Sequence, residues 1–580
     1  MNQYVFIFSI GPVQSFIAEA RRTADLYAGS HILSQLSAAA AKTIAPPHQL
    51  IFPHPNTLDK ETGTPNKLVA VLQIESEHDV AGVIKNIADK AQKAAKDCWF
   101  GMSSKALFEL GLQDPEFHPL WERQKNTLLE FYWVALPFEG GYIKTYKKAN
   151  EALDARKRLR LFGQAAEEDL KDSLSGQRQA LRTHEEDAEK FWKRIRQAKA
   201  ENKRRVKEHE RLDTIAAIKR FGVDSDSFPS VSTIASMDFA MALDEADKQS
   251  LVNKIAATGA FYTVDDFGRD FPYDGDLLYT ATYNEKRLTD SYGKAELDVR
   301  PITEELKRLH KSVGAPSPYY TILVMDGDNM GKHLDQCKNE EQHQEISKQL
   351  GIFADSMTHV VAKYMGSLVY AGGDDVFAFL PLSTALPAAA EINQRFQETV
   401  DWQTFGEQFP FTMSAGIAVV HHMAPLDWAL AEARATEKAA KNQYGRNAIV
   451  VRLLKRSGDS KQMGGRWSTV PLVQQLYGYF KEEKLSSRMA HDLLTHAEVT
   501  TGVSLAHSPM IKLMLKRHKS KDKSKGFTDV ELDQLADELS QWVLHHEAIV
   551  PPKDDVKQGL TELGFWLTFA RFMAQGGQDE

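Results

Sequence analysis

One feature constrains this chain more than any other, namely the alternation of apolar and helical stretches between residues 317 and 455. The apolar run "YYTILVM" leads into the helical stretch "EEQHQEISKQLGIFADSMTHVVAKYM", and the runs "SLVYA" and "VFAFLP" then form a hairpin pattern. A second helical stretch, "ALPAAAEINQRFQETV", precedes the strand "FTMSAGIAVV", and one more helix and strand follow. The order βαββαβ predicts a ferredoxin-like sheet covered on one face by helices.

The first third of the chain repeats part of this plan. The strand "YVFIFSI" enters the helix "PVQSFIAEARRTADLYAGS", and "NKLVAVLQI" and "LLEFYWVALPF" supply later strands. When "FIFSIGP" is laid on "ILVMDGD", Asp326 and Asp328 of the second copy fall opposite Ile10 and Pro12 of the first. We therefore expect two related domains, of which only the second carries acidic residues at this strand end.

The length of 580 residues requires several domains, because single hydrophobic cores stop growing well below that size. We expect an α+β chain with two ferredoxin-like domains, helical insertions and an all-helical C-terminal domain. The expected boundaries are a first palm-like domain at 1–145, a charged helical linking domain at 146–315, a second palm at 316–456, and a helical C-terminal domain at 457–580.

The net charge of −8 shows no global positive field, so contacts with nucleic acid would have to use local patches. Cys98 and Cys337 are the only cysteines, which is too few for a disulfide framework or a four-cysteine zinc site. The N-terminal segment lacks the features of a signal peptide, and no apolar run reaches the length of a membrane span. These observations predict a soluble protein of the cytoplasm.

Residues 151–220 and 512–526 are rich in Lys and Arg. One interpretation of 151–220 is a solvated helical pair with surface ion pairs. The other is a surface that follows a phosphate backbone, with Phe191 and Trp192 stacking on bases. The same two aromatic residues could instead anchor the packing of their helix. Residues 512–526 form a basic loop before a predicted capping box at "TDVE".

Acidic residues stand at the ends of neighbouring strands in the second repeat. Asp326 ends one strand, and Asp374 and Asp375 lie in the turn of the hairpin "YAGGDDVFAF". A ferredoxin-like sheet brings these strands together, and crowded carboxylates repel one another unless a cation holds them. Oxygen ligands of this kind suit Mg²⁺ or Mn²⁺, and a pair of such ions supports phosphoryl transfer.

Glycines accompany these acids at both strands. Gly372 and Gly373 allow a tight turn and the close approach of a triphosphate, and Gly327 and Gly331 repeat this pattern in "DGDNMG". The alternative is a structural turn in which the aspartates only cap backbone amides.

Several segments resemble the large, polymerase-like subunit of type III CRISPR effector complexes, particularly its Cmr-type version. They are "GPVQSFIAEARRTADLYAGSHILS", "FPSVSTIA", "VMDGDNMG", "YAGGDDVFAFLP" and "SAGIAVVHH", and they occur in the family's order within residues 1–455. The resemblance implies two palm-like domains similar to nucleotide cyclases, of which the second is active. It also implies synthesis of cyclic oligoadenylate from ATP when guide RNA pairs with target RNA, beside other Cmr-type subunits.

The resemblance also implies roles for individual residues. Asp326, Asp374 and Asp375 would be catalytic and would hold the metal ions, with Asp328 a weaker candidate. Gly327, Gly331, Gly372 and Gly373 would line the nucleotide site. Ser414 and Lys441 would face the base or the phosphates. For Lys441, an exposed helix lysine without such a role is an equal alternative.

Two departures from the family pattern stand out. Many members begin with a His-Asp nuclease domain, whereas here the palm segment starts at residue 4, and the pairs His78-Asp79 and His491-Asp492 lack partner histidines. We therefore expect no DNase activity. The cysteine zinc motif expected before "FPSVSTIA" is also missing, so we expect no zinc.

Other functions remain open from the sequence. A relative of diguanylate cyclases is one, since "SAGIA" and "YGRN" resemble that family, although the hairpin has Asp-Asp-Val-Phe instead of Asp-Glu-Phe. The acceptor of AMP could be S-adenosylmethionine in place of ATP. A catalytically silent scaffold is the third alternative. The sequence does not show the acceptor, the ring size of the product or the guide.

Overall fold

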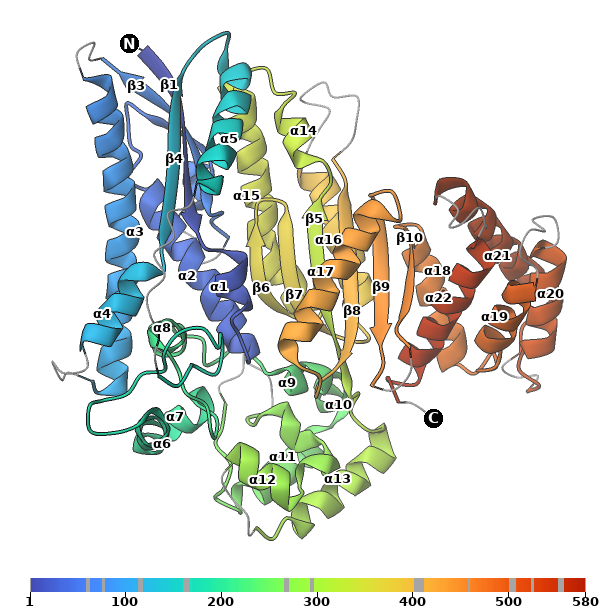
Figure 1. Cartoon of the computed structure of the whole chain (residues 1–580). Coiled ribbons are helices and arrows are strands. Elements are labelled where there is room, and N and C mark those ends of the chain that lie inside the picture. Colours follow the sequence, from blue (N-terminus) through green and yellow to red (C-terminus); the bar gives the residue numbers. More distant parts are fainter. Residues whose placement is uncertain are drawn as a thin grey trace.

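Two sheets form the centre of the computed structural model, and four strands of each follow the same order (Figure 1). The structure describes residues 2–58, 63–75, 79–112, 118–159, 167, 169–264, 271–292, 297–400, 411–456, 459–499, 507–522, 526–550 and 558–578. Within these ranges, none of the helices is both long and apolar enough to span a bilayer. His78 of the predicted His78-Asp79 pair lies outside the described residues.

The first sheet has the order β2-β3-β1-β4. Its strands are β1 (Asn2–Gly11), β2 (Gln49–Phe52), β3 (Lys67–Ile74) and β4 (Glu130–Pro137), and β1 pairs antiparallel with both β3 and β4. Helices α2 (Thr23–Ala41) and α3 (Val80–Leu110) complete a βαββαβ unit. Val5 and Ile7 pack on one face of β1 and Phe6 and Phe8 on the other, because successive side chains alternate along a strand.

The second sheet has the order β10-β9-β8-β5-β7-β6. Its strands are β5 (Tyr319–Gly327), β6 (Ser367–Gly372), β7 (Asp375–Pro381), β8 (Met413–His421), β9 (Ala448–Leu454) and β10 (Lys461–Arg466). The central β5 pairs antiparallel with β7 and β8, just as β1 pairs with β3 and β4. The predicted repeat of the ferredoxin-like plan is therefore confirmed.

Helices cover both faces of the second sheet, whereas the sequence predicted helices on one face. Leu323 of β5 packs in the same cluster as α15 (Glu340–Lys363) and α16 (Ala385–Thr399). Ile322, which points to the opposite face, packs with α17 (Leu426–Asn442) and α9 (Val231–Ala235). The prediction was wrong because β5, β7 and β8 are apolar at nearly every position, which is the pattern of a sheet buried on both sides.

The C-terminal region is helical apart from one strand. Residues 461–466, which the sequence placed in the all-helical domain, form β10 and pair antiparallel with β9. In the described part of this region, the helices after β10 are α18 (Thr469–Lys481), α19 (Met489–Val499), α20 (His507–His518), α21 (Asp529–Ile549) and α22 (Gly559–Ala574). Their apolar faces share one cluster with α15, α16 and the second sheet, so this domain and the second palm have a continuous core.

The basic segment between the two sheets forms short helices and not one long helical pair. It includes α5 (Tyr142–Arg158), α6 (Ala188–Ala198), α7 (Ala200–Arg205) and α8 (Thr214–Phe221). Phe191 and Trp192 are fully buried and meet edge to face with ring centroids 5.3 Å apart. They therefore anchor the packing of α6, and the alternative in which they stack on bases is wrong.

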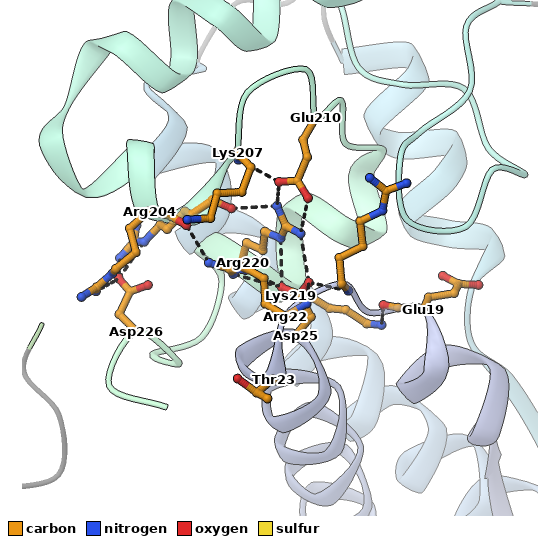
Figure 2. Close-up of polar contacts among 12 residues, drawn as sticks. Glu19, Arg22, Thr23, Asp25, Arg204, Lys207, Glu210, Lys219, Arg220 and Asp226 are labelled. Carbon is orange, nitrogen blue, oxygen red and sulfur yellow. Dashed lines mark hydrogen bonds and ion pairs between the residues drawn. The ribbon is translucent and has the colours of Figure 1, made fainter. Parts of the chain in front are cut away.

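A buried ion cluster joins α2 to α8 (Figure 2). Arg220 donates through Nε and Nη2 to the two carboxylate oxygens of Asp25, each at 2.9 Å, and through Nη1 to Glu210 at 2.6 Å. Arg22 adds a further bond to Asp25 at 3.0 Å. Burial alone would raise the pKa of Asp25, but the charges of Arg220 and Arg22 outweigh burial and hold that pKa well below its usual range.

The two palms also meet directly. The side chain of Gln344 on α15 donates to the backbone carbonyl of Leu50 on β2 at 2.8 Å. Tyr142 of α5 lies 2.8 Å from Nδ1 of the buried His343. These contacts place the β2 edge of the first palm beside α15 of the second.

Replacing Arg220 tests the buried ion cluster. Arg220→Met leaves Asp25 and Glu210 buried without their cation, and we expect a loss of about 3–5 kcal/mol of folding free energy. Thermal melting at neutral pH measures the effect. Arg300→Met is the matched control, since Arg300 pairs with Asp298 at an exposed site and its loss changes stability by about 0.5 kcal/mol or less. Equal melting temperatures for the two variants would contradict a structural role for the cluster.

Candidate active site

The end of β5 and the turn between β6 and β7 form one edge of the second sheet. The antiparallel register pairs Met325 with Val376, so the next residues along the strands, Asp326 and Asp375, follow at the same level. Gly372 pairs with Asp375 across the hairpin, which leaves Gly373 and Asp374 as its turn. Gly373 has a φ of 66°, a conformation that favours glycine. The three predicted metal-binding carboxylates therefore lie on adjacent strand ends.

Gly327 allows Asp374 to approach β5. A Cβ atom at Gly327 would lie 2.6 Å from Oδ2 and 2.8 Å from Cβ of Asp374, which is closer than real contacts allow. The backbone N–H of Gly327 donates to the Asp374 carboxylate. Because Gly327 has no side chain, the Asp374 carboxylate can lie against the end of β5.

The other predicted glycines have different surroundings. A Cβ at Gly372 would collide with the phenol of Tyr370, 2.1 Å from its oxygen, so this glycine makes room for a side chain of its own strand. Gly331 has open space around it. The nearest atom to a Cβ at Gly373 is Cζ of Phe52, at 3.9 Å, and Phe52 belongs to β2 of the first palm. The first palm therefore borders the hairpin turn.

Lys441 points from α17 toward the carboxylate edge. Its Nζ forms an ion pair with Oδ2 of Asp326 and lies 2.9 Å from Oε1 of Glu437. The Lys441 side chain is only 19% exposed, so the alternative of a freely exposed helix lysine does not describe it. Burial, with a smaller contribution from the charge of Arg446, lowers the pKa of Lys441 to about 8.

Asp328 and Ser414 form a buried network beneath the edge. The Ser414 hydroxyl donates to Oδ1 of Asp328 at 2.7 Å, and Oδ2 accepts from the Thr412 hydroxyl and the Asn447 backbone N–H, each at 2.8 Å. Asp328 and Ser414 are 1% and 0% exposed. From the sequence, Asp328 is a weaker candidate for the metal and nucleotide site and Ser414 a contact of the base or phosphates; in the structure the two side chains bond to each other. The Asp328 carboxylate thus accepts from two hydroxyls at the start of β8 and from the backbone of the "YGRN" turn.

Burial and mutual repulsion raise the pKa values of the carboxylates. Burial, with the charge of Asp375 second, raises the pKa of Asp374 to about 7, and burial raises the pKa of Asp375 to about 6. Asp374 is half-buried and Asp375 is exposed at the rim, so burial acts more strongly on Asp374. Burial, with Asp375 second, also raises the pKa of Glu437 to about 7.

The sequence reasoning missed Glu437. It lies four residues before Lys441 on α17, a spacing that places the two side chains on the same helix face, and this was the available signal. Helix α17 approaches β8 closely at Gly416. A Cβ atom there would lie 2.2 Å from the backbone nitrogen of Glu437, so only glycine allows this approach. Gly416 therefore lets the helix carry Glu437 and Lys441 to the edge of the sheet.

The donor chemistry of the edge fits a divalent cation, although its ligands are not assembled. Asp326, Asp374 and Asp375 offer only oxygen ligands, the kind that Mg²⁺ and Mn²⁺ prefer. No described Lys or Arg other than Lys441 forms an ion pair with any of the three. Within the described ranges, no three His, Cys, Asp or Glu side chains already form a metal-binding group. Lys441 occupies the position of a cation beside Asp326.

Two family models match parts of the chain that contain strands of both sheets. Residues 5–103 match the family model "CRISPR-associated protein Cmr2, N-terminal", and residues 319–450 match "Cas10/Cmr2, second palm domain". The chain is 26% identical to the Cmr subunit Cmr2 of Pyrococcus furiosus, over 91% of this chain and 71% of that protein.

Solved structures share the fold. A chain of the type III-B Cmr-beta complex in its apo state matches with a TM-score of 0.65 at 14% identity, covering 90% of this chain and 78% of that one. A chain of Cmr-beta bound to cognate target RNA matches with a TM-score of 0.64 at 12% identity, covering 90% and 79%. Together with the family matches, these findings are consistent with a Cmr2-type large subunit.

The raised pKa values predict how stability depends on pH in the absence of metal ions. Asp374 and Asp375 bind protons more tightly in the folded chain than in the unfolded chain, so their ionisation counts against folding. The stability that the two protonated carboxyl groups add to the folded chain is therefore lost as the pH rises from about 4 to about 7. Asp374→Asn with Asp375→Asn removes this dependence, and we expect the variant to melt about 2 °C above the wild type at pH 8, with a clearly smaller difference at pH 5.

Calorimetry in a chelating buffer measures this difference. Asp97→Asn is the control, because Asp97 pairs with Lys93 on the exposed face of α3 and its replacement shifts the melting temperature equally at both pH values. A wild-type minus double-variant difference that does not change with pH would contradict the crowding of the two carboxylates.

Proposed function

We propose that this Cmr2-type large subunit uses the carboxylate edge of its second palm to make cyclic oligoadenylate from ATP when guide RNA pairs with target RNA. The observation that carries the proposal is the placement of Asp326, Asp374 and Asp375 on adjacent strand ends, with Asp374 against Gly327 and Lys441 paired with Asp326. The setting rests on the comparisons, since the curated relative is a Cmr subunit and one structural neighbour is a Cmr-beta complex bound to cognate target RNA.

Asp326, Asp374 and Asp375 would hold divalent metal ions, Mg²⁺ or Mn²⁺. Such ions, when bound, neutralise the phosphates and lower the pKa of an attacking hydroxyl. A cation bound at Oδ2 of Asp326 would compete with Lys441, because Nζ of Lys441 is paired with that oxygen. The displaced ammonium is then available for a phosphate group of ATP.

The chain's own residues can be assigned complementary roles. In the proposed reaction a ribose hydroxyl loses its proton to water and its oxygen attacks the α-phosphorus of ATP. The bond from that phosphorus to the oxygen shared with the β-phosphate breaks, and pyrophosphate leaves. Lys441 donates to phosphate oxygens and Glu437 orients it from one helical turn away. Gly331, which has open space around it, leaves room for the triphosphate. Asp328 and Ser414 position the strand end from below.

The proposal includes no DNase activity and no zinc, and it places the protein in the cytoplasm. We expect no DNA cleavage, because His491 and Asp492 do not act as a pair: Oδ2 of Asp492 lies 3.0 Å from Nε2 of His518. We also expect that the chain needs no zinc, and that it works in the cytoplasm among other Cmr-type subunits and their guide and target RNA.

The purified effector complex with guide RNA, matched target RNA, Mg²⁺ and labelled ATP tests the proposal. We expect products with the masses of cyclic oligoadenylates, and we expect Asp374→Asn with Asp375→Asn to lower the rate by more than about a hundredfold. Asp97→Asn is the control and leaves the rate unchanged. Product formation that survives the double replacement would refute the site.

The same assay separates the alternatives. A conjugate of AMP with S-adenosylmethionine, formed only when that compound is added, would change the acceptor and keep the site. Cyclic diguanylate made from GTP without RNA would indicate a diguanylate cyclase. No nucleotide product under any condition would indicate a scaffold.

Gly327→Ala tests the geometry of the edge without changing a charge. The added Cβ would collide with Asp374, so the carboxylate must move, and a displacement of about 1 Å at a reacting centre reduces rates by about a hundredfold. Gly101→Ala on α3 is the control, since its Cβ would meet no atom within 4 Å. Unchanged turnover in Gly327→Ala would show that the position of Asp374 does not matter.

A further inference from the structure

A basic groove lies in the C-terminal domain, on elements that the carboxylate site does not use. The end of α18, the start of α19, the end of α20 and the end of α22 line it, and its volume is about 810 Å³. Figure 1 shows these helices grouped at the C-terminal end of the molecule, beyond β10. We call it the basic groove, because its lining includes six basic residues, Lys481, Arg488, Arg517, Lys519, Lys521 and Arg571.

The charge of the groove is opposite to that of the chain. The whole chain has a net charge of −8, yet the lining of the groove combines six Lys and Arg with two carboxylates, Glu483 and Asp492. One of these carboxylates already has a partner, since Oδ2 of Asp492 lies 3.0 Å from Nε2 of His518. Like charges gathered in one concave surface repel one another, and an anionic partner relieves this repulsion.

Most of the basic groups have no anionic partner of their own. No described carboxylate forms an ion pair with the side chains of Arg488, Arg517 or Lys521, which are all exposed. Nε of Arg571 is buried and has no hydrogen-bond partner among the described residues, while Nη1 donates to the Ser487 carbonyl at 3.1 Å. Lys519 approaches Asp529 only at 3.9 Å.

Backbone hydrogen bonds hold the walls of the groove together. The Ser486 N–H donates to the His518 carbonyl and the Ser520 N–H to the Lys484 carbonyl, each at 2.9 Å. Leu485 and Lys519 form an isolated antiparallel bridge between them. The segment after α20 is therefore fixed to the segment before α19, so the basic side chains project from a paired backbone and their relative positions are defined.

We propose that this basic groove binds the phosphodiester backbone of a single nucleic acid strand. Arg and Lys from four helix ends offer separated positive charges, which suits a chain of phosphates. The large apolar side chains in the lining are Phe480 and Leu485, both buried, so the groove offers no aromatic anchor of the kind that protein interfaces use. For the same reason we expect little preference for base sequence, because base stacking needs an exposed ring.

The proposal goes beyond the nucleotidyl transfer and does not depend on it. It also gives a role to the described part of residues 512–526, which the sequence analysis noted only as a basic loop. The groove explains how an acidic chain can contact nucleic acid through a local patch.

Salt-dependent binding of labelled 30-nucleotide single strands to the full chain tests the groove. The groove variant is Arg488→Gln with Arg517→Gln and Lys521→Gln. For single strands each lost phosphate contact lowers the slope of log Kd against log salt by about 0.7, so we expect the slope to fall by about 2. The control variant replaces three exposed cations of α13 (Arg300–Val313), Arg300, Lys307 and Lys311, with Gln, and we expect it to keep the wild-type slope.

Further arms separate the sources of the phosphates and the kind of partner. RNA and DNA strands of the same sequence are compared, and loss of binding of either strand in the groove variant supports the proposal. Arg488→Lys with Arg517→Lys retains the charges and should retain the slope. Unchanged binding of both strands by the groove variant would overturn the proposal. Equal competition by polyglutamate of matched charge would also overturn it, since an acidic polypeptide would then suffice.

Two controls keep this result distinct from the others. The three replaced side chains are exposed, so the melting temperature of the groove variant should equal that of the wild type. Asp374→Asn with Asp375→Asn should bind the strands like the wild type, so a failure of the nucleotidyl transfer proposal would leave the groove proposal standing, and the reverse also holds.

Discussion

Electrostatic repulsion among carboxylates at one sheet edge is the constraint on which the rest of the site depends. Asp374 can lie against β5 only because Gly327 has no side chain. Burial, with the charge of Asp375 second, raises the pKa of Asp374 to about 7. A cation must compensate when the carboxylates ionise. In this structure α17 supplies one by placing Lys441 on Asp326, and Gly416 permits the close packing of that helix on β8. The edge therefore has the donors of a metal site and a protein cation beside one of them.

The first palm lacks the acids but has a structural role. It repeats the strand order of the second, with Ile10 and Pro12 at the positions that correspond to Asp326 and Asp328. Phe52 of β2 borders the turn at Gly373, and a Cβ at Gly63 would collide with the carbonyl of Ala371, so this palm forms a wall beside the hairpin. The buried contact of Asp25 with Arg220 in turn fixes the first palm to the linking domain.

The sequence predicted most of the fold and the placement of the acids, because both depend on local patterns. Strand runs and the "AGGDD" turn determine the register that brings Asp326 level with Asp375. The partners of individual side chains could not be predicted, because they depend on how separate elements pack. Lys441 meets Asp326 through the docking of α17, and Ser414 turns to Asp328 because β8 lies beside β5. The strand β10 was missed because "KQMGGR" has no apolar alternation.

The proposed cation site has one direct test, the location of Mn²⁺ by anomalous scattering in crystals of the chain grown with ATP. The account predicts Mn²⁺ bound to the carboxylates of Asp326, Asp374 and Asp375, with the Lys441 ammonium moved from Asp326 to a phosphate group. Mn²⁺ bound elsewhere, with Lys441 still paired to Asp326 beside a bound nucleotide, would contradict the claim that these carboxylates form the active site.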